Sequence, residues 1–200
     1  MKLYTSTKYK DFLLCINAFG ISEQQLKELF DKAAKNAIPE RFKVNYNNLI
    51  FGKLCQLQAI ENNADFFTVA PFVILEPVTG WRSKKYIKKI IGYWYRYKFL
   101  NGRMLHALSF IVNMQKELER ITNAFKSIEY KPTREEIKAG VKEANNSMHN
   151  IADWYALRMG ITDVGSVYFI PWSIIWKAMQ IDNNNNEIKR RLYEIQSKKK

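Results

Sequence analysis

The sequence is poor in the residues that carry most enzyme and metal chemistry. Cys15 and Cys55 are its only cysteines and lie far apart, which indicates neither a disulfide framework nor a paired-cysteine metal site. It has no phosphate-binding glycine loop, nucleophile elbow, zinc signature or paired acidic motif. His106 lies in an apolar run and His149 on a polar helix face, so we interpret both as ordinary packed or solvated residues. We therefore expect no enzyme activity, no catalytic residue, no metal and no cofactor.

Long uninterrupted apolar segments are missing too. The uncharged stretch from Val164 to Trp176 contains Pro171 and is too short to cross a hydrocarbon core of about 30 Å. Near the start of the chain, Asp11 interrupts the apolar run that follows Lys2, and no small-residue cleavage site comes after it, unlike an export signal. We therefore expect a soluble product that is made in the cytoplasm and has no membrane partner.

Acidic residues are absent between Glu76 and Glu117, although the whole chain has a formal net charge of +13. The cations of this interval are Arg82, Lys84, Lys85, Lys88, Lys89, Arg96, Lys98, Arg103 and Lys116. Such a concentration predicts a surface for nucleic acid or an acidic protein. The alternative is the lysine- and asparagine-rich bias that an AT-rich genome imposes on any protein.

Two periodicities compete over residues 84–110. Tyr93, Tyr95 and Tyr97 occupy alternate positions before a hairpin signal at Asn101-Gly102, which is typical of a two-stranded ribbon. Helical spacing covers more residues, namely Ile87, Ile90, Ile91, Trp94, Tyr97, Leu100, Met104, Leu108, Ile111, Met114 and Leu118. We therefore predict two helices joined at Asn101-Gly102, with Gly102 in the left-handed conformation and the lysines beside the apolar stripe.

Helix signals dominate the rest of the chain. Ser22 with Gln25 forms a capping box for one helix, and a second box begins at Thr133 and opens a helix that ends at Gly160. Residues 64–80 contain Pro71 and other breakers around an apolar β-branched run, which favours an extended segment or a short strand. We predict a mainly α protein with a helical domain over residues 1–182. Residues 183–200 are predicted to form an asparagine linker, at 183–186, and a projecting basic helical arm.

Aromatic residues crowd the segment VGSVYFIPWSIIWKAM. Because aromatic and arginine side chains anchor subunit interfaces, this segment predicts an interface, with packing in the core as the alternative. The predicted interface comprises Tyr168, Phe169, Trp172, Trp176, Lys189, Arg190 and Arg191.

Aromatic and basic residues also alternate in the segment YWYRYKF of residues 93–99. Exposed rings can stack on bases while cations track phosphates, although on a helix about half of these rings would face the core. The residues predicted to contact DNA or an acidic partner are Arg82, Lys84, Lys85, Lys88, Lys89, Arg96, Lys98 and Arg103.

The C-terminal third, DVGSVYFIPWSIIWKAMQIDNNNNEIKRRLYEIQSKKK behind EEIKAGVKEANNSMHNIADWYALRMG, resembles virion proteins of tailed bacteriophages. It is similar in layout to head-to-tail connector, ring and small tail-assembly proteins of Bacteroides phages, the crAss-like phages in particular. The resemblance implies a non-enzymatic ring or connector subunit of the virion. Its partners would be copies of itself, portal or tail subunits, and DNA through non-specific contacts. A tail-assembly chaperone and a small non-specific DNA-binding protein are the alternatives.

Overall fold

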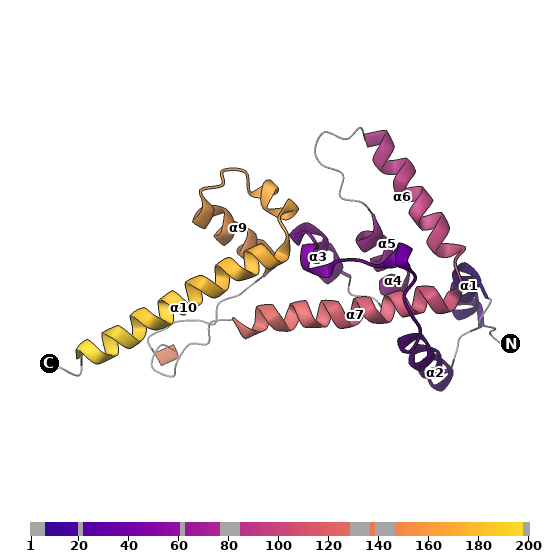
Figure 1. Cartoon of the computed structure of the whole chain (residues 1–200), viewed down its shortest axis with the longest axis horizontal. Coiled ribbons are helices and arrows are strands. Elements are labelled where there is room, and N and C mark those ends of the chain that lie inside the picture. The colour runs from indigo at the N-terminus through magenta and orange to yellow at the C-terminus, as the bar shows by residue number, and fades with distance from the viewer. Residues whose placement is uncertain are drawn as a thin grey trace. The chain divides into compact units, whose positions relative to one another are not determined.

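The computed structural model describes residues 7–19, 22–60, 63–76, 85–128, 137–138 and 147–197, and it is mainly helical, as predicted (Figure 1). The α-helices are α1 (Tyr9–Phe19), α2 (Glu23–Ala34), α3 (Phe51–Gln58), α4 (Asn63–Thr68), α5 (Ala70–Leu75), α6 (Lys85–Leu100), α7 (Met104–Ser127), α9 (Met148–Met159) and α10 (Trp172–Ser197). The 3-10 helices are η1 (Glu40–Phe42), η2 (Tyr46–Asn48) and η3 (Val164–Phe169). Within these ranges strand-like pairing is limited to isolated bridges, Lys8 with Arg103 and Ile50 with Pro171.

Two predicted helix ends are present. The Ser22 hydroxyl accepts a hydrogen bond from the backbone nitrogen of Gln25 and caps α2. Gly160 ends α9 with a φ of 66°, a left-handed conformation that costs glycine little. The start that we predicted for this helix, at Thr133, lies outside the described residues, and α9 as described begins at Met148, where the Ser147 hydroxyl caps it.

The extended segment predicted near residues 64–80 is wrong over its described part, because α4 and α5 occupy it. Pro71 lies in the first turn of α5, where a missing backbone N–H costs nothing because that group has no partner within the helix. A proline that we interpreted as a breaker is therefore a helix start. Residues 77–80 lie outside the described ranges.

The prediction of two helices joined at Asn101-Gly102 is correct for the described residues, since α6 ends at Leu100 and α7 begins at Met104. The predicted left-handed Gly102 is wrong, because Gly160 is the one residue with positive φ in the described part. Hydrogen bonds to the start of the chain hold this corner instead. The backbone nitrogen of Tyr9 donates to Gly102 at 3.0 Å, and that of Met104 donates to Thr7 at 2.7 Å.

The chain divides into two compact units. Unit 1 comprises Met1–Asn45 and Gln56–Leu118, and unit 2 comprises Tyr46–Cys55 and Glu119–Lys200.

The core of unit 1 is an aromatic cluster around Phe99, the last large buried residue of α6. Its ring centroid lies 5.2 Å from that of Tyr9, 5.3 Å from that of Phe42, and 5.7 Å from those of Phe72 and Phe110. Edge-to-face pairs of this kind add stabilisation beyond the buried area. The C-terminal end of α6 is therefore the part of that helix held in the core.

The core of unit 2 joins the start of α10 to η2 and to α7. The ring of Trp172 packs 5.9 Å from Phe125, and Phe125 packs 6.4 Å from Phe51. Backbone hydrogen bonds from Phe51 to Ile170, at 2.8 Å, and from Trp172 to Leu49, at 3.0 Å, fix the two segments side by side.

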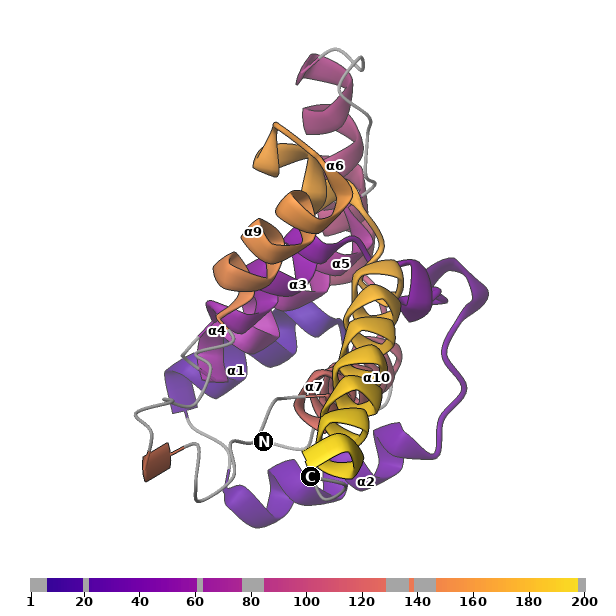
Figure 2. The same cartoon turned by 90° about the vertical axis from the view of Figure 1, so that its left-hand side faces the viewer.

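Helix α10 runs unbroken from Trp172 to Ser197, as both views show (Figures 1 and 2). The linker predicted at residues 183–186 is therefore wrong. Asparagine lowers helix propensity by only a few tenths of a kcal/mol per residue, which neighbouring turns and contacts can outweigh. Here the Asn183 amide donates to the Ile128 carbonyl at 2.8 Å and ties this turn to unit 2.

Candidate functional site

Trp172 of the predicted aromatic interface lies in the core of the isolated chain, and Trp176 is partly covered. Trp172 is only 3% exposed, and its indole nitrogen donates to the Tyr46 carbonyl at 2.7 Å. Trp176 is half-buried and donates to the Ala124 carbonyl at 2.9 Å. Because the chain itself covers Trp172 and satisfies its indole, we correct the prediction of a surface anchor to one of core packing for Trp172. Trp176 is only partly covered, and its part in an interface stays a prediction.

Tyr168 and Phe169 differ from each other in exposure. The Tyr168 ring packs 6.2 Å from Phe51, and its hydroxyl lies 2.9 Å from Nδ1 of His149. Burial, followed by the nearby Cys55 and Asp153, raises the pKa of Tyr168. Phe169 is 54% exposed and is the one exposed residue among the predicted aromatic anchors.

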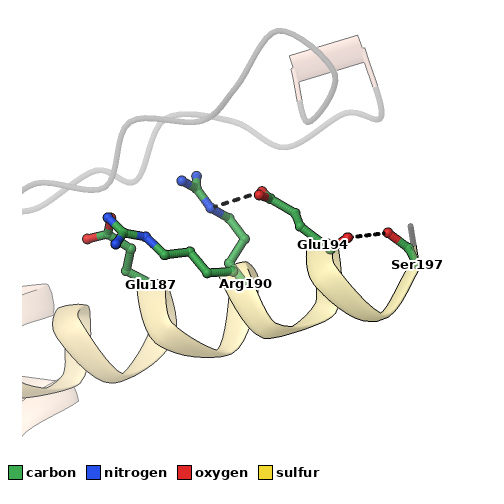
Figure 3. A network of polar contacts seen from close by, with 5 residues as sticks. Glu187, Arg190, Glu194 and Ser197 are labelled. Atoms are coloured by element: carbon green, nitrogen blue, oxygen red, sulfur yellow. Dashed lines mark hydrogen bonds and ion pairs between the residues drawn. The ribbon is translucent and has the colours of Figure 1, made fainter. Parts of the chain in front are cut away.

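The basic residues predicted for the arm lie on the exposed C-terminal part of α10. Arg190 pairs with Glu194 at 3.7 Å, and Arg191 pairs with Glu187, each one helical turn away (Figure 3). Lys189 is exposed on the same part of the helix. Such pairs contribute only about 0.2–0.5 kcal/mol each to the helix. These pairs lie within α10 and support the helix. They therefore do not indicate a contact with a partner.

Unit 2 contains an open cleft of about 700 Å³ between side chains of α7, α9 and α10. Its walls are mostly apolar, and its cations are Arg120, Arg158 and Lys177. Arg158 pairs with Asp182 at 2.7 Å, and Arg120 donates to the Asn47 side chain at 2.8 Å. In the part of the chain that the structure describes, no carboxylate, imidazole or thiol lines this cleft.

The exposed part of α6 carries a second feature. The side chains of Ile90, Tyr93, Trp94 and Tyr97 recur at helical spacing and are 51–68% exposed. We expected Ile90, Trp94 and Tyr97 to share the apolar stripe on which the chain packs. The structure instead places them outside the core of unit 1, because Phe99 and its neighbours make the core contact. We name these four residues the α6 face.

Two cations of α6 lie against aromatic rings, one at the α6 face and one at the core cluster of unit 1. The Lys98 ammonium is 3.8 Å from the centre of the Trp94 ring, and the Arg96 guanidinium is 5.2 Å from the centre of Phe72. Arg103, the third described member of the predicted basic set, is exposed at the corner between α6 and α7. Arg82 and Lys84 lie outside the described residues, as do the side chains of Lys85, Lys88 and Lys89.

Sequence reasoning missed the exposure of the α6 face and an exposed apolar stripe on α10. The α10 stripe has a signal that the sequence carries plainly, because Ile174, Ile181, Ile188 and Ile195 are spaced by seven residues. In the described ranges, no group of three His, Cys, Asp or Glu side chains comes close enough to hold a metal ion. No described helix is both long and apolar enough to cross a membrane.

Comparisons with protein-family models, with curated proteins and with solved structures find no match to this chain.

Proposed function

We propose that this chain is a non-enzymatic structural subunit of a tailed-phage virion, a ring or connector protein of the neck or tail. The observation that carries the proposal is the α6 face, on which Trp94 and Tyr97 lie exposed among apolar neighbours. Contiguous exposed apolar surface marks contact sites, and tryptophan and tyrosine are enriched among the residues that dominate binding energy. The resemblance of residues 130–200 to phage head-to-tail proteins is the reason for proposing a phage particle as the assembly to which the chain belongs.

In this proposal the α6 face binds a neighbouring virion protein. Lys98 lies against the Trp94 ring of this face, and Arg96 and Arg103 are further exposed cations near the end of α6. The sequence has no acidic residue between Glu76 and Glu117. Opposite charge on a neighbour would orient the contact and exclude wrong partners, while the rings supply most of its affinity. The neighbour is therefore expected to present an apolar groove with an acidic rim.

Non-specific DNA binding is the second candidate, because aromatic and basic side chains alternate on α6. Base stacking needs a free ring face, however, and Lys98 already covers one face of Trp94 at 3.8 Å. This contact favours a protein neighbour over single-stranded DNA. Gel-shift titration at several salt concentrations separates the two, since binding through phosphates falls steeply as salt rises.

Protein mass spectrometry of purified particles tests the proposal. We expect the chain in the particles at a fixed copy number, and we expect Trp94→Ser/Tyr97→Ser to prevent its incorporation. The matched control is Leu157→Ser, which removes an exposed apolar side chain of α9 that is not part of the α6 face. A chain present in infected cells but absent from particles would contradict the proposal and indicate an assembly chaperone. Equal incorporation of both variants would show that the α6 face is not needed for assembly and would contradict that part of the proposal.

A further inference from the structure

Helix α10 carries a heptad repeat on exposed positions. In heptad notation Ile174, Ile181, Ile188 and Ile195 occupy d, and Ala178, Asn185 and Leu192 occupy a. The four isoleucines and Leu192 are 47–57% exposed although all are large and apolar. We name these seven residues the α10 seam. A seam sustained over three heptads is typical of a helix that packs against another helix in a coiled coil.

From Asn185 onward the seam lies opposite the face by which α10 packs in its own unit, whereas Ile174, Ala178 and Ile181 line the cleft formed with α7 and α9. At 3.6 residues per turn, Trp172, Trp176 and Asn183 share one side of the helix, and their hydrogen bonds to residues 46, 124 and 128 show that this side meets unit 2. Further along, the same side carries Arg190 and Glu194, which form an ion pair (Figure 3). The chain thus uses one side of α10, together with the flank that carries the buried Ile175, and leaves the seam residues from Asn185 to Ile195 exposed.

In the described part of the chain, the last half of α10 is held mainly by its own ion pairs. Every residue from 184 to 197 is exposed, and the segment begins with three asparagines, which are poor helix formers. Isolated helices shorter than about 12–15 residues are marginal in water, and most helix stability in proteins comes from packing of an apolar face. A partner on the seam would supply that packing.

Asn185 indicates what the partner is. A lone asparagine at an a position is a device that sets register, because its amide can donate to and accept from the same residue of a parallel, in-register helix. In an antiparallel pair the a position faces a d position. Each d position of the seam is isoleucine, which would leave the buried amide without a hydrogen-bond partner at a cost of about 1–3 kcal/mol. In a parallel pair, Asn185 of one helix would bond to Asn185 of the other, so the partner helix is expected to come from a second copy of this chain.

The flanking charges agree with the parallel arrangement. The g positions are Lys177, Asn184 and Arg191, and an antiparallel pair would set cations of one helix against cations of the other. In a parallel pair, Lys177 at g approaches Asp182 at e of the neighbour, and opposite charges meet. Arg158 of the same chain engages Oδ2 of that carboxylate, which still has a second oxygen.

We propose that α10 associates with α10 of further copies of this chain as a parallel, in-register coiled coil through the α10 seam. This inference rests on the function proposed above in that both require copies to assemble, but it concerns a different surface. Isoleucine at d with leucine at a favours three or four strands over two. We therefore expect the purified full-length chain to have a mass of three or four copies.

Light scattering and sedimentation of the purified full-length chain test the contact. Ile188→Asn/Ile195→Asn should weaken self-association by roughly 100-fold, since each lost anchor contributes about tenfold or more. Both side chains are exposed in the single chain, so the thermal unfolding midpoint of the dissociated protein should not change. The matched control is Tyr193→Asn, which makes the same kind of replacement on the same turns but off the seam and should leave association unchanged.

Disulfide trapping tests the orientation. Leu192→Cys places thiols across the axis of a parallel, in-register bundle, and mild oxidation should yield covalent dimers well above the background of the unmodified chain. Ser197→Cys, at the outward f position, should yield none above that background. Efficient trapping only at Ser197→Cys would overturn the proposal, as would a trapping yield for Leu192→Cys equal to that background.

A third variant tests the role of Asn185. Asn185→Ile should tighten association and broaden the distribution of masses, because it removes the residue that sets the register. A wild-type chain that remains monomeric at every concentration overturns the seam proposal, even where particle mass spectrometry finds the chain in virions. Conversely, a parallel oligomer that never enters a particle leaves the seam proposal standing and contradicts the proposed function.

Discussion

The indole nitrogen of Trp172 donates a hydrogen bond of 2.7 Å to the backbone carbonyl of Tyr46, 126 positions earlier in the chain. The same ring packs on Phe125 and carries the Arg120 guanidinium 5.7 Å from its centre. One side chain thus links η2, the C-terminal end of α7 and the start of α10. Unit 2 depends on this ring for the junction of three segments.

Replacing Trp172 by alanine should therefore destabilise the chain. Large-to-small changes of buried aromatic residues cost about 3–5 kcal/mol. This one also removes one of two hydrogen bonds to the Tyr46 carbonyl, which keeps its bond from the backbone nitrogen of Leu49. Thermal unfolding by circular dichroism should show a midpoint lower by many degrees. Phe169→Ala, in the same segment but exposed, should change the free energy of unfolding by about 0.5 kcal/mol or less. Equal effects of the two changes would contradict the assignment of Trp172 to the core.

Ser109 offers a parallel test in unit 1. It is a buried polar residue, and its hydroxyl lies 2.8 Å from the Ala33 carbonyl and 2.7 Å from the Leu105 carbonyl, which joins α2 to α7. Ser109→Ala should lower the free energy of unfolding by about 1 kcal/mol, since a typical intramolecular hydrogen bond contributes that much. Ser127→Ala removes an exposed hydroxyl that contacts only its own helix, and chemical denaturation should show little change.

Cys55 should react slowly with alkylating agents near neutral pH. Burial raises the pKa of this thiol from 9.0 to about 11, and the thiolate is the reactive form. The alkylation rate, followed by peptide mass spectrometry, should therefore rise with a midpoint near about 11 in the folded chain and near 9.0 in denaturant.

The sign of the linked effect on stability follows from the same shift. The folded chain holds the Cys55 proton more tightly than the unfolded chain, so this contribution to stability is present below pH 9.0 and is lost as the pH rises towards about 11. A folded-state alkylation midpoint near 9.0 would contradict the burial of this thiol.

Local signals in the sequence predicted the helix ends well. Ser22 and Gly160 act through their own backbone or through residues three or four positions away, so a short window contains the cause. The corner at 101–102 was predicted from a local signal too, but hydrogen bonds to Thr7 and from Tyr9 hold it. Pro71 and the asparagine run at 183–186 misled the prediction, because the same residues that break a helix interior are acceptable in a first turn or beside stabilising contacts.

Periodicity could not say what covers each apolar stripe. The helical spacing of Ile90, Trp94 and Tyr97 was visible, but it fits a core and a partner surface equally. Trp172 presented the opposite problem. A tryptophan is typical of interfaces, but it also packs well in a core when its indole nitrogen has a hydrogen-bond acceptor, as it has here in the Tyr46 carbonyl. A contact between positions 126 residues apart decides the case of Trp172, and no local pattern records it.

Two helical glycines should respond in opposite ways to the same substitution. A Cβ on Gly52 of α3 would lie 2.9 Å from the backbone oxygen of Tyr168, and the hydrogen bond between Phe51 and Ile170 prevents the two segments from moving apart freely. Gly52→Ala should therefore cost about 1–3 kcal/mol through overpacking. A Cβ on Gly92 of α6 would meet only the end of the Glu76 side chain, at 3.3 Å, and that carboxylate can shift.

Gly92→Ala should consequently stabilise α6 by about 0.5–1 kcal/mol, because alanine loses less backbone entropy on folding than glycine. For a chain of this length each kcal/mol moves the unfolding midpoint by about 2–4 °C, so differential scanning calorimetry resolves both changes. A rise in both midpoints would show that α3 and η3 can separate to admit a methyl group. That outcome would contradict the close contact at Gly52 while leaving the rest of unit 2 unaffected.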